Sequence, residues 1–426
     1  MKARWARRAV CSMAVTAAAG ALAPGAGAAT ASLGTLPATA DRLTAYGGWV
    51  LFSERSARGD WSLMAWHAGS IVALPVPARS IPFDAEAGPG ADGHAAAVFS
   101  KCVREPRVRG GEGQMLAAAV EWQTASGCRI YELSLPGGTP RLLARIRPPR
   151  GSSDATPAIW RGEVAFARYG RAGPPQLLLS GTRNVRHLGG GPSSCPAPST
   201  ISEAPLCRRH ERLLRSRVTG ISLSAGAAVY EWVAEVPGSF VGPSADPEIR
   251  IDPLRSGAQS APTKLLEMRF ASGACGGSWS GSPNAVAGKA LYLRTAYACE
   301  AGPERLTSSF EIAPPVGRVR SSGTGGHILA LALAWDSGTA YWLGLVPSPP
   351  AACTGNPACQ RERTAGQPCP PQSVCETARP LPAQFGCEPA EGACTLMRTT
   401  GLAAASSVGA AGKRRGAVSR PGAARH

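Results

Sequence analysis

The chain alternates short apolar runs with polar turns over most of its length. The first unit of this pattern has apolar runs at 47–53, 61–66 and 71–74, the first two ending before polar turns and the third before a proline. Runs of this length that contain aromatic and β-branched residues are typical of strands. The pattern therefore predicts small antiparallel sheets joined by turns.

Similar units recur along the chain. They cover 90–100 with 128–133 and 141–144, then 157–168 with 176–179, and later 220–232, 282–294 and 329–344. A spacing of about 45–60 residues fits β-propeller blades with loop insertions. A single four-stranded sheet cannot bury its faces alone, whereas blades stacked around an axis share one core. We predict an all-β chain that forms a β-propeller of about six four-stranded blades, with a pair of β-sandwiches as the alternative architecture.

Composition supports strands over long helices. The chain has 51 Gly and 38 Pro residues, and only 17% of its residues are charged. Gly and Pro between short apolar runs favour turns, and scarce charge pairs disfavour exposed helices. A length of 426 residues exceeds the size at which a single core usually stops growing, about 250–300 residues. A modular propeller accommodates this length in one domain.

One turn and the run that follows it carry a recognisable motif. Gly90-Ala91-Asp92-Gly93, followed by Ala97-Val98-Phe99-Ser100, is similar to the S-P-D-G-x-x-[IV]-[AV]-[FY] repeat of TolB-like, WD40-like β-propellers, with Gly-Ala in place of Ser-Pro. From about residue 46 to 400, the layout resembles uncharacterised secreted TolB-like propellers of high-GC bacteria. This resemblance implies a propeller that binds partner proteins in the cell envelope. It identifies a fold and does not specify an activity.

The first 29 residues have the organisation of a signal peptide. A basic segment at 1–8 precedes an apolar segment at 9–23, and small residues at 26–28 form a cleavage pattern. We expect a secreted protein of the cell envelope, without a transmembrane segment in the mature chain. An uncleaved membrane anchor is the alternative, although the apolar segment is short for a bilayer of about 30 Å.

These features divide the chain into five parts. We expect a signal peptide at 1–29, a linker at 30–43 and propeller blades at 44–346. A Cys/Pro-rich, disulfide-closed segment with a closing strand follows at 347–400. The tail at 401–426 is rich in Ala, Gly and Arg and is predicted to be disordered.

The cysteines indicate disulfides. Of 13 cysteines, Cys11 lies in the predicted signal peptide, which leaves an even number in an oxidising compartment. Pairing between sequence neighbours is the simplest scheme: Cys102 with Cys128, Cys195 with Cys207, Cys275 with Cys299, Cys353 with Cys359, Cys369 with Cys375, and Cys387 with Cys394. A zinc site in the last cluster is the alternative, but it contains no C-x-x-C pair and no histidine.

Common catalytic motifs are absent from the sequence. It contains no G-x-S-x-G, no H-E-x-x-H and no P-loop, and no two histidines lie within four residues of each other. We therefore expect a protein that is not an enzyme and has no cofactor and no metal. The alternative is a polysaccharide hydrolase or lyase that uses carboxylates at the propeller channel. The turn carboxylates that could serve it are Asp84, Asp92, Asp154, Asp246, Asp252 and Asp336.

The distribution of charge and one charged insertion indicate which kinds of partner to expect. The net charge is +17, partly contributed by the two ends of the chain, and the remaining charge is dispersed along the sequence. We therefore expect no nucleic-acid partner. The insertion at 189–217 carries Arg208, Arg209, His210 and Arg212, which form a possible binding loop. The expected partner is an envelope or extracellular protein or polymer, and the protein is expected to be a monomer.

Overall fold

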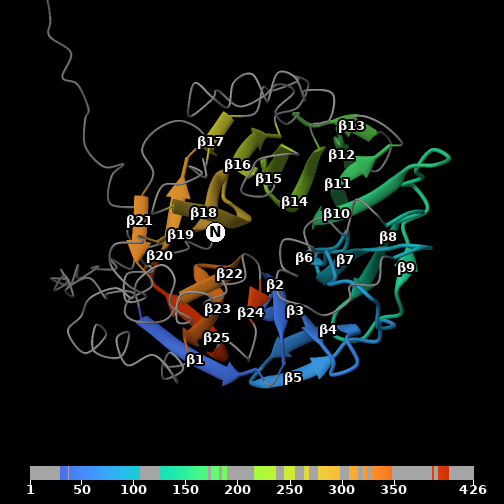
Figure 1. Ribbon diagram of the computed structural model, residues 1–426. Coiled ribbons are helices and arrows are strands. Elements are labelled where there is room, and N and C mark those ends of the chain that lie inside the picture. The colour runs from blue at the N-terminus through green and yellow to red at the C-terminus, as the bar shows by residue number, and fades with distance from the viewer. Residues whose placement is uncertain are drawn as a thin grey trace, which may run out of the picture.

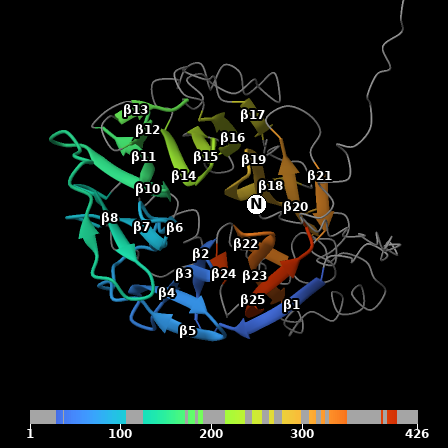
Figure 2. The ribbon, with the colours of Figure 1, turned by 180° about the vertical axis from the view of Figure 1, so that it is seen from behind.

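Figure 1 shows a computed structural model in which small sheets are arranged in a ring. The structure describes residues 29–36, 38–105, 125–170, 174–181, 185–189, 215–236, 244–254, 263–267, 277–297, 307–314, 320–323, 329–347, 386–387 and 392–402. All regular elements among these residues are strands. They form six antiparallel sheets, so the described chain is an all-β propeller of six blades, as the sequence predicts. The same ring is visible from behind in Figure 2.

The first three blades follow the chain from the axis outward. Blade 1 comprises β2 (Ala40–Tyr46), β3 (Trp49–Arg55), β4 (Trp61–His67) and β5 (Ser70–Ala73), with β24 (Gly386–Cys387) added beside β2. Blade 2 comprises β6 (Glu86–Pro89), β7 (Ala95–Lys101), β8 (Arg129–Ser134) and β9 (Arg141–Leu142). Blade 3 comprises β10 (Ser153–Trp160), β11 (Glu163–Tyr169), β12 (Gln176–Ser180) and β13 (Val185–His187).

The last three blades complete the ring. Blade 4 comprises β14 (Arg215–Ser224), β15 (Ala227–Val236), β16 (Ser244–Pro253) and β17 (Thr263–Glu267). Blade 5 comprises β18 (Gly277–Val286), β19 (Lys289–Tyr297), β20 (Thr307–Ala313) and β21 (Arg320–Gly323). Blade 6 comprises β22 (Leu329–Asp336), β23 (Thr339–Pro347), β25 (Gly392–Thr400) and β1 (Ala29–Thr35).

Blade 6 closes the ring with strands from both ends of the described chain. β1 pairs antiparallel with β25, and Thr30 Oγ1 lies 2.9 Å from Thr399 Oγ1. The predicted linker at 30–43 is therefore wrong, because this stretch contains most of β1 and the start of β2. The sequence of β1, ATASLGT, is too weakly apolar to indicate a strand. β1 is extended because it is hydrogen-bonded to β25.

The hydrophobic core lies between neighbouring blades. Each pair of adjacent blades shares an apolar cluster that combines buried side chains from both. Pairs of residues that represent these six clusters, in order around the ring, are Leu51 with Phe99, Val98 with Phe166, Ala167 with Trp232, Ile251 with Tyr292, Leu293 with Trp342, and Leu343 with Phe52. The face that each blade cannot cover alone is thus buried by the next blade.

Polar side chains also join neighbouring blades. Asp336 at the β22–β23 turn accepts a hydrogen bond from Gly48 N of blade 1, at 2.8 Å. Thr44 of blade 1 accepts one from Ala87 N of blade 2, at 2.9 Å. Similar bonds join the remaining neighbours: Asp84 with Thr156, Thr156 with Val218, Ser222 with Ala285, and Asn284 with Leu333. These contacts fix the position of the innermost strands around the axis.

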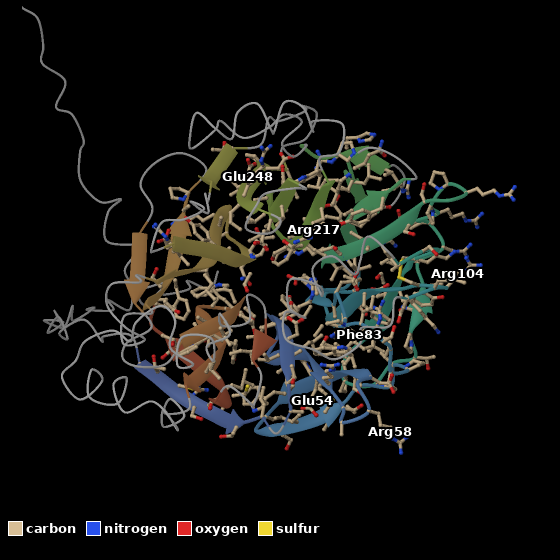
Figure 3. The ribbon with its side chains drawn as sticks, in the orientation of Figure 1. Glu54, Arg58, Phe83, Arg104, Arg217 and Glu248 are labelled. Carbon is tan, nitrogen blue, oxygen red and sulfur yellow. A yellow bond between two sulfur atoms is a disulfide. The ribbon has the colours of Figure 1, made fainter. Side chains whose placement is uncertain are left out.

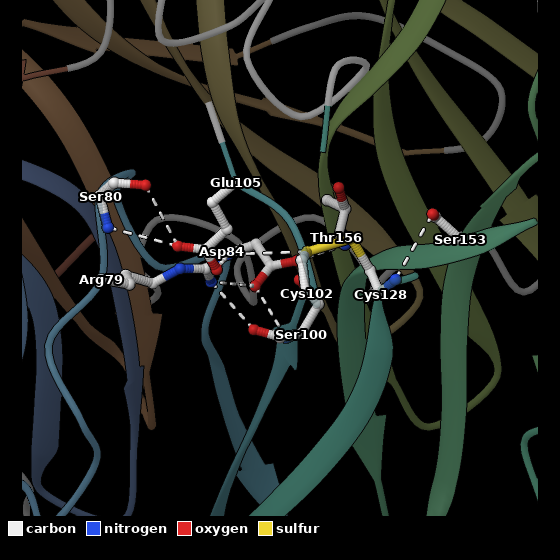
Figure 4. Close-up of a disulfide and its surroundings, with 9 residues drawn as sticks. All are labelled: Arg79, Ser80, Asp84, Ser100, Cys102, Glu105, Cys128, Ser153 and Thr156. Carbon is white, nitrogen blue, oxygen red and sulfur yellow. Dashed lines mark hydrogen bonds and ion pairs between the residues drawn. A yellow bond between two sulfur atoms is a disulfide. The ribbon is translucent and has the colours of Figure 1, made fainter. Parts of the chain in front are cut away.

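A disulfide joins Cys102, directly after β7, to Cys128, directly before β8 (Figure 4). The two cysteines are 26 residues apart in the sequence, and the bond joins the ends of the segment between them. Next to it, Arg79 pairs with Glu105 at 2.6 Å and donates to Ser100 O at 2.9 Å. The disulfide and the buried arginine therefore hold the same end of blade 2.

Removing this disulfide is expected to lower stability. Replacing both cysteines in a Cys102→Ser/Cys128→Ser variant frees a loop of this length in the unfolded chain, which costs about 3 kcal/mol. Thermal unfolding of the oxidised variant, followed by circular dichroism, should show a Tm several degrees lower than that of the oxidised wild type. An unchanged Tm would show that the bond does not contribute to stability.

Candidate functional site

The six innermost strands surround a small cavity on the propeller axis, which we call the axial cavity. Its volume is about 70 Å3. Every blade contributes to its lining, with Arg42, Glu86, Thr156, Thr219, Ser282 and Ala332 from blades 1 to 6 in order. A site on the axis of a propeller is therefore built from positions that are far apart in the sequence.

β-Bulges turn side chains toward this cavity. The pairing register shifts between Asp41 and Thr44 in β2, and equivalent shifts occur in β10, β14, β18 and β22. Three residues at these bulges, Arg42, Thr156 and Ser282, have φ angles of 55°, 52° and 54°. A bulge adds one residue to a strand and redirects its side chain. These non-glycine residues in a left-handed conformation are held there by the paired strands on either side.

Three carboxyl groups at the cavity have raised pKa values. Burial raises the pKa of Asp41 to about 6, that of Glu86 to about 8 and that of Glu231 to about 7. The physical cause is the same in each case, because removing a carboxylate from water penalises its charged form. The axial cavity therefore holds a group of acids that titrate near neutral pH.

Arg42 provides the opposing charge. Its Nη1 donates across the axis to Thr219 O of blade 4, at 2.8 Å. Its positive charge lowers the pKa values of Asp41, Glu86 and Glu231, which burial raises. Thr219 Oγ1 in turn donates to Glu231 Oε2 at 2.6 Å. Arg42 thus links blades 1 and 4 and partly neutralises the acids around it.

Glu86 is held by blades on both sides of the axis. It forms side-chain hydrogen bonds with Thr44 of blade 1 and Ser222 of blade 4. Two other oxygen atoms have no hydrogen-bond partner within the described part of the chain, Asp41 Oδ1 and Glu231 Oε1. Asp41 is 6% exposed and Glu231 is 2% exposed. The cavity therefore has free acceptor positions and room for a few water molecules or a small polar group, at about 10–15 Å3 for each water.

Asp84 is the one turn carboxylate predicted from the sequence that lines the axial cavity. Asp154 instead pairs with Arg168, at 2.7 Å. Asp252 accepts from Gly189 N, and Asp336 accepts from Gly48 N. Within the described chain these carboxylates thus have structural partners. Of the other two, Asp92 lies in an exposed turn and the side chain of Asp246 is outside the described residues.

Sequence reasoning missed Asp41, Glu86 and Glu231. Its search for carboxylates was restricted to turns, whereas these three lie on strands. A charged residue inside an apolar run, such as Glu231 between Tyr230 and Trp232, is a signal that could have identified them. Buried charges need a partner, so such a position indicates a polar site at the inner edge of a sheet.

Several predicted positions lie outside the described residues. They include the possible binding loop with Arg208, Arg209, His210 and Arg212, and the cysteines Cys195, Cys207, Cys275, Cys299, Cys353, Cys359, Cys369 and Cys375. Cys394 of β25 is disulfide-bonded, to a sulfur atom outside the described side chains. These predictions therefore remain predictions.

Neither a metal-binding cluster nor a membrane-spanning helix is found in the described part of the chain. No three His, Cys, Asp or Glu side chains there are grouped so that they could hold a metal ion. No helix there has the length and hydrophobicity that crossing a bilayer requires.

Comparison of the sequence with protein-family models and with curated proteins finds no match. Among solved structures, TolB from Acinetobacter baumannii is similar at 11% identity and a TM-score of 0.30, over 66% of this chain and 56% of that one. The β-propeller domain of the Trilobed protease from Pyrococcus furiosus is similar at 9% identity and a TM-score of 0.34, over 72% and 91%. A polysaccharide lyase of family PL25, an ulvan lyase, is similar at 8% identity and a TM-score of 0.39, over 75% and 82%. These likenesses concern the propeller fold alone.

Proposed function

We propose that the protein is an exported, noncatalytic β-propeller that acts as a monomer and binds a protein or polymer partner of the cell envelope. The axial cavity is the observation that carries this proposal. At about 70 Å3 it is smaller than the pockets of about 300–1,000 Å3 that hold drug-sized ligands. Glu86 bonds to side chains of blades 1 and 4, Arg42 bonds to backbone of blade 4, and Glu231 bonds to Thr219 of its own blade. Glu86 and Arg42 thus link blades across the axis.

The outer strands support partner binding. Apolar side chains are exposed on the outermost strands of blades 1, 2 and 3: Ile71, Val72, Leu142 and Val185. An outermost strand also leaves one edge without a neighbouring strand in its sheet. The Cys102–Cys128 disulfide is consistent with the oxidising compartment that the signal-peptide pattern predicts.

A binding experiment combined with an activity screen tests the proposal. The immobilised full-length protein should capture a partner from an envelope extract, and the purified partner should then bind saturably. Binding should be unchanged in Glu231→Gln, because this side chain faces the axial cavity. No polysaccharide in a broad panel should gain reducing ends or unsaturated products. Absence of saturable binding to any purified candidate would contradict the proposal.

A polysaccharide hydrolase or lyase is the second candidate. The pKa values of about 8 for Glu86 and about 7 for Glu231 lie near the pH at which a general acid or base works best. This candidate predicts product formation in the same screen, with a loss of at least about 100-fold in Glu231→Gln. Turnover that depends on Glu231 would replace the first proposal with this one.

A further inference from the structure

Charged side chains are distributed unequally between the inside and the outside of the propeller. Most described carboxylates are buried, and they are Asp41, Asp84, Asp154, Glu231, Glu248, Asp252, Glu311 and Asp336. Most described arginines of blades 2 and 3 are exposed. Among the described carboxylates of these two blades, only Asp92 and Glu163 are fully exposed, so exposed arginines outnumber exposed carboxylates on their surface.

Five exposed cations lie on the segments next to the Cys102–Cys128 disulfide, and we call them the basic patch: Lys101, Arg104, Arg129, Arg147 and Arg150. Lys101 and Arg129 each adjoin a disulfide cysteine and face each other across the β7–β8 pair. Arg104 follows Cys102 by two residues, and Figure 3 shows it at the outer edge of the ring.

The segment before β10 brings the other two arginines to the same end of the sheets. Asp154 N donates to Cys128 O at 3.1 Å, so the start of β10 lies against the disulfide. Arg150 precedes β10 by three residues. The carbonyl oxygen of Arg147 accepts a hydrogen bond from Arg168 Nη2 at 3.3 Å. Arg168 lies near the end of β11, and this end pairs with the start of β10. Both arginines are therefore placed next to blade 2.

Two described carboxylates on the adjoining segments are already paired with other residues. Glu105 pairs with Arg79 at 2.6 Å, and Asp154 pairs with Arg168 at 2.7 Å. Within the described chain, none of the five cations of the basic patch forms an ion pair. Five exposed cations that have no ion pair among the described residues, on neighbouring segments, attract an anionic ligand.

We propose that the basic patch binds an acidic polysaccharide, which deepens and rests on the proposed function of partner binding. Arginine pairs with carboxylates through two parallel hydrogen bonds, so a chain of uronate residues offers matching groups along its length. Val103 lies within the patch and is 83% exposed, which provides an apolar contact for the nonpolar face of a sugar ring.

The described aromatic side chains near this surface do not favour binding of single-stranded nucleic acid, because they are already packed. Binding of single strands relies on exposed aromatic rings on which bases stack. Among the described residues, the aromatic side chain beside Lys101 is Tyr131, which is half-buried, stacks on Phe99 with ring centroids 6.1 Å apart, and has Lys101 Nζ 6.0 Å from its centroid. Within the described residues, the patch thus offers positive charge without a free stacking surface.

Binding of polygalacturonate to the full-length protein, measured by titration calorimetry, tests this proposal. The Arg129→Gln/Arg150→Gln variant should bind at least about tenfold more weakly than wild type, since a loss of about 1.4 kcal/mol corresponds to tenfold. The matched control is Arg58→Gln/Arg398→Gln, which removes two exposed arginines from blades 1 and 6 and should change Kd by less than about twofold. Binding should weaken as salt is raised from about 50 to about 300 mM.

Three outcomes would overturn the proposal. Equal weakening in both variants would show that the net charge of the chain binds the polymer without a defined site. Tighter binding of polyphosphate or of duplex DNA than of polygalacturonate would show a phosphate polymer as the ligand. Binding of a purified protein partner that is unaffected in Arg129→Gln/Arg150→Gln, with no polysaccharide binding, would reject the basic patch while the proposed function holds. Turnover that depends on Glu231 would instead reject the proposed function.

Discussion

Replacing Asp84 with alanine should destabilise the propeller by about 3–5 kcal/mol, the cost of breaking a buried, hydrogen-bonded charge site. Asp84 is 3% exposed. Its Oδ1 accepts from Ser100 N at 2.8 Å, and its Oδ2 accepts from Thr156 N of blade 3 at 2.7 Å. Arg79 Nη1 lies 3.9 Å from Oδ1. The variant removes the acceptor for two buried N–H groups and a negative charge beside a buried guanidinium.

Two further variants separate these contributions. Asp84→Asn keeps one good acceptor and should lose less stability, about 1–2 kcal/mol. Asp60→Ala, an exposed carboxylate in the β3–β4 turn, is the control and should stay within about 0.5 kcal/mol of wild type. For a domain of this size, the loss in Asp84→Ala corresponds to a Tm lower by roughly 5 °C. A Tm equal to that of Asp60→Ala would contradict the expectation.

The strands of individual blades can be predicted from the sequence. The predicted runs at 157–168 and 176–179 coincide with the hairpin of β10 and β11 and with β12. These strands can be recognised from a short stretch of sequence, because their apolar side chains alternate with small or polar ones and face the neighbouring blade. Trp232 and Trp342, which lie in such apolar runs, are buried in the clusters between blades.

The closure of the ring cannot be predicted in the same way. Thr30 and Thr399 are 369 residues apart in sequence, and β1 is an exposed strand with little apolar content. A strand of this kind is stabilised by its hydrogen-bonded partner, so its own sequence does not distinguish it from a linker. The assignment of 30–43 as a linker failed for this physical reason.

The candidate sites depend on contacts between distant segments. Asp41 and Arg42 read as ordinary surface charges in the sequence, and only the bulge in β2 places them at the axis. The basic patch combines Arg129 of β8 with Arg150, which precedes β10, because the disulfide and the start of β10 meet. A charge that is dispersed along the sequence can therefore be concentrated in space.

The axial acids should make the propeller less stable as the pH rises from about 5 to about 9. The pKa values of Asp41, Glu86 and Glu231 are about 6, 8 and 7 in the folded protein, above their values in the unfolded chain. Between the unfolded and the folded values, the folded state binds more protons than the unfolded state. Stability is then complete below the unfolded pKa and is lost as the pH rises through the folded pKa.

The size of the effect follows from the raised pKa values. Each pKa unit corresponds to about 1.4 kcal/mol, and the raised pKa values already include the charge of Arg42. Above pH 5 the three values span about six pKa units, so we expect a fall of at most about 8 kcal/mol in the free energy of unfolding over this range, measured by urea titration at several pH values. Tyr169 does not contribute to it, because its pKa is raised to about 12.

The Glu86→Gln/Glu231→Gln variant should show a flatter dependence, because glutamine keeps the size of the side chain and remains uncharged at every pH. The difference between variant and wild type should therefore be small near pH 5 and should favour the variant near pH 9. The control, Glu163→Gln on the exposed side of β11, should follow the wild-type curve. A variant that loses stability in parallel with wild type across the range would show that the ionisation of these buried acids does not oppose folding. In that case the contacts of Arg42 and Thr219 would compensate fully for burial of the carboxylates.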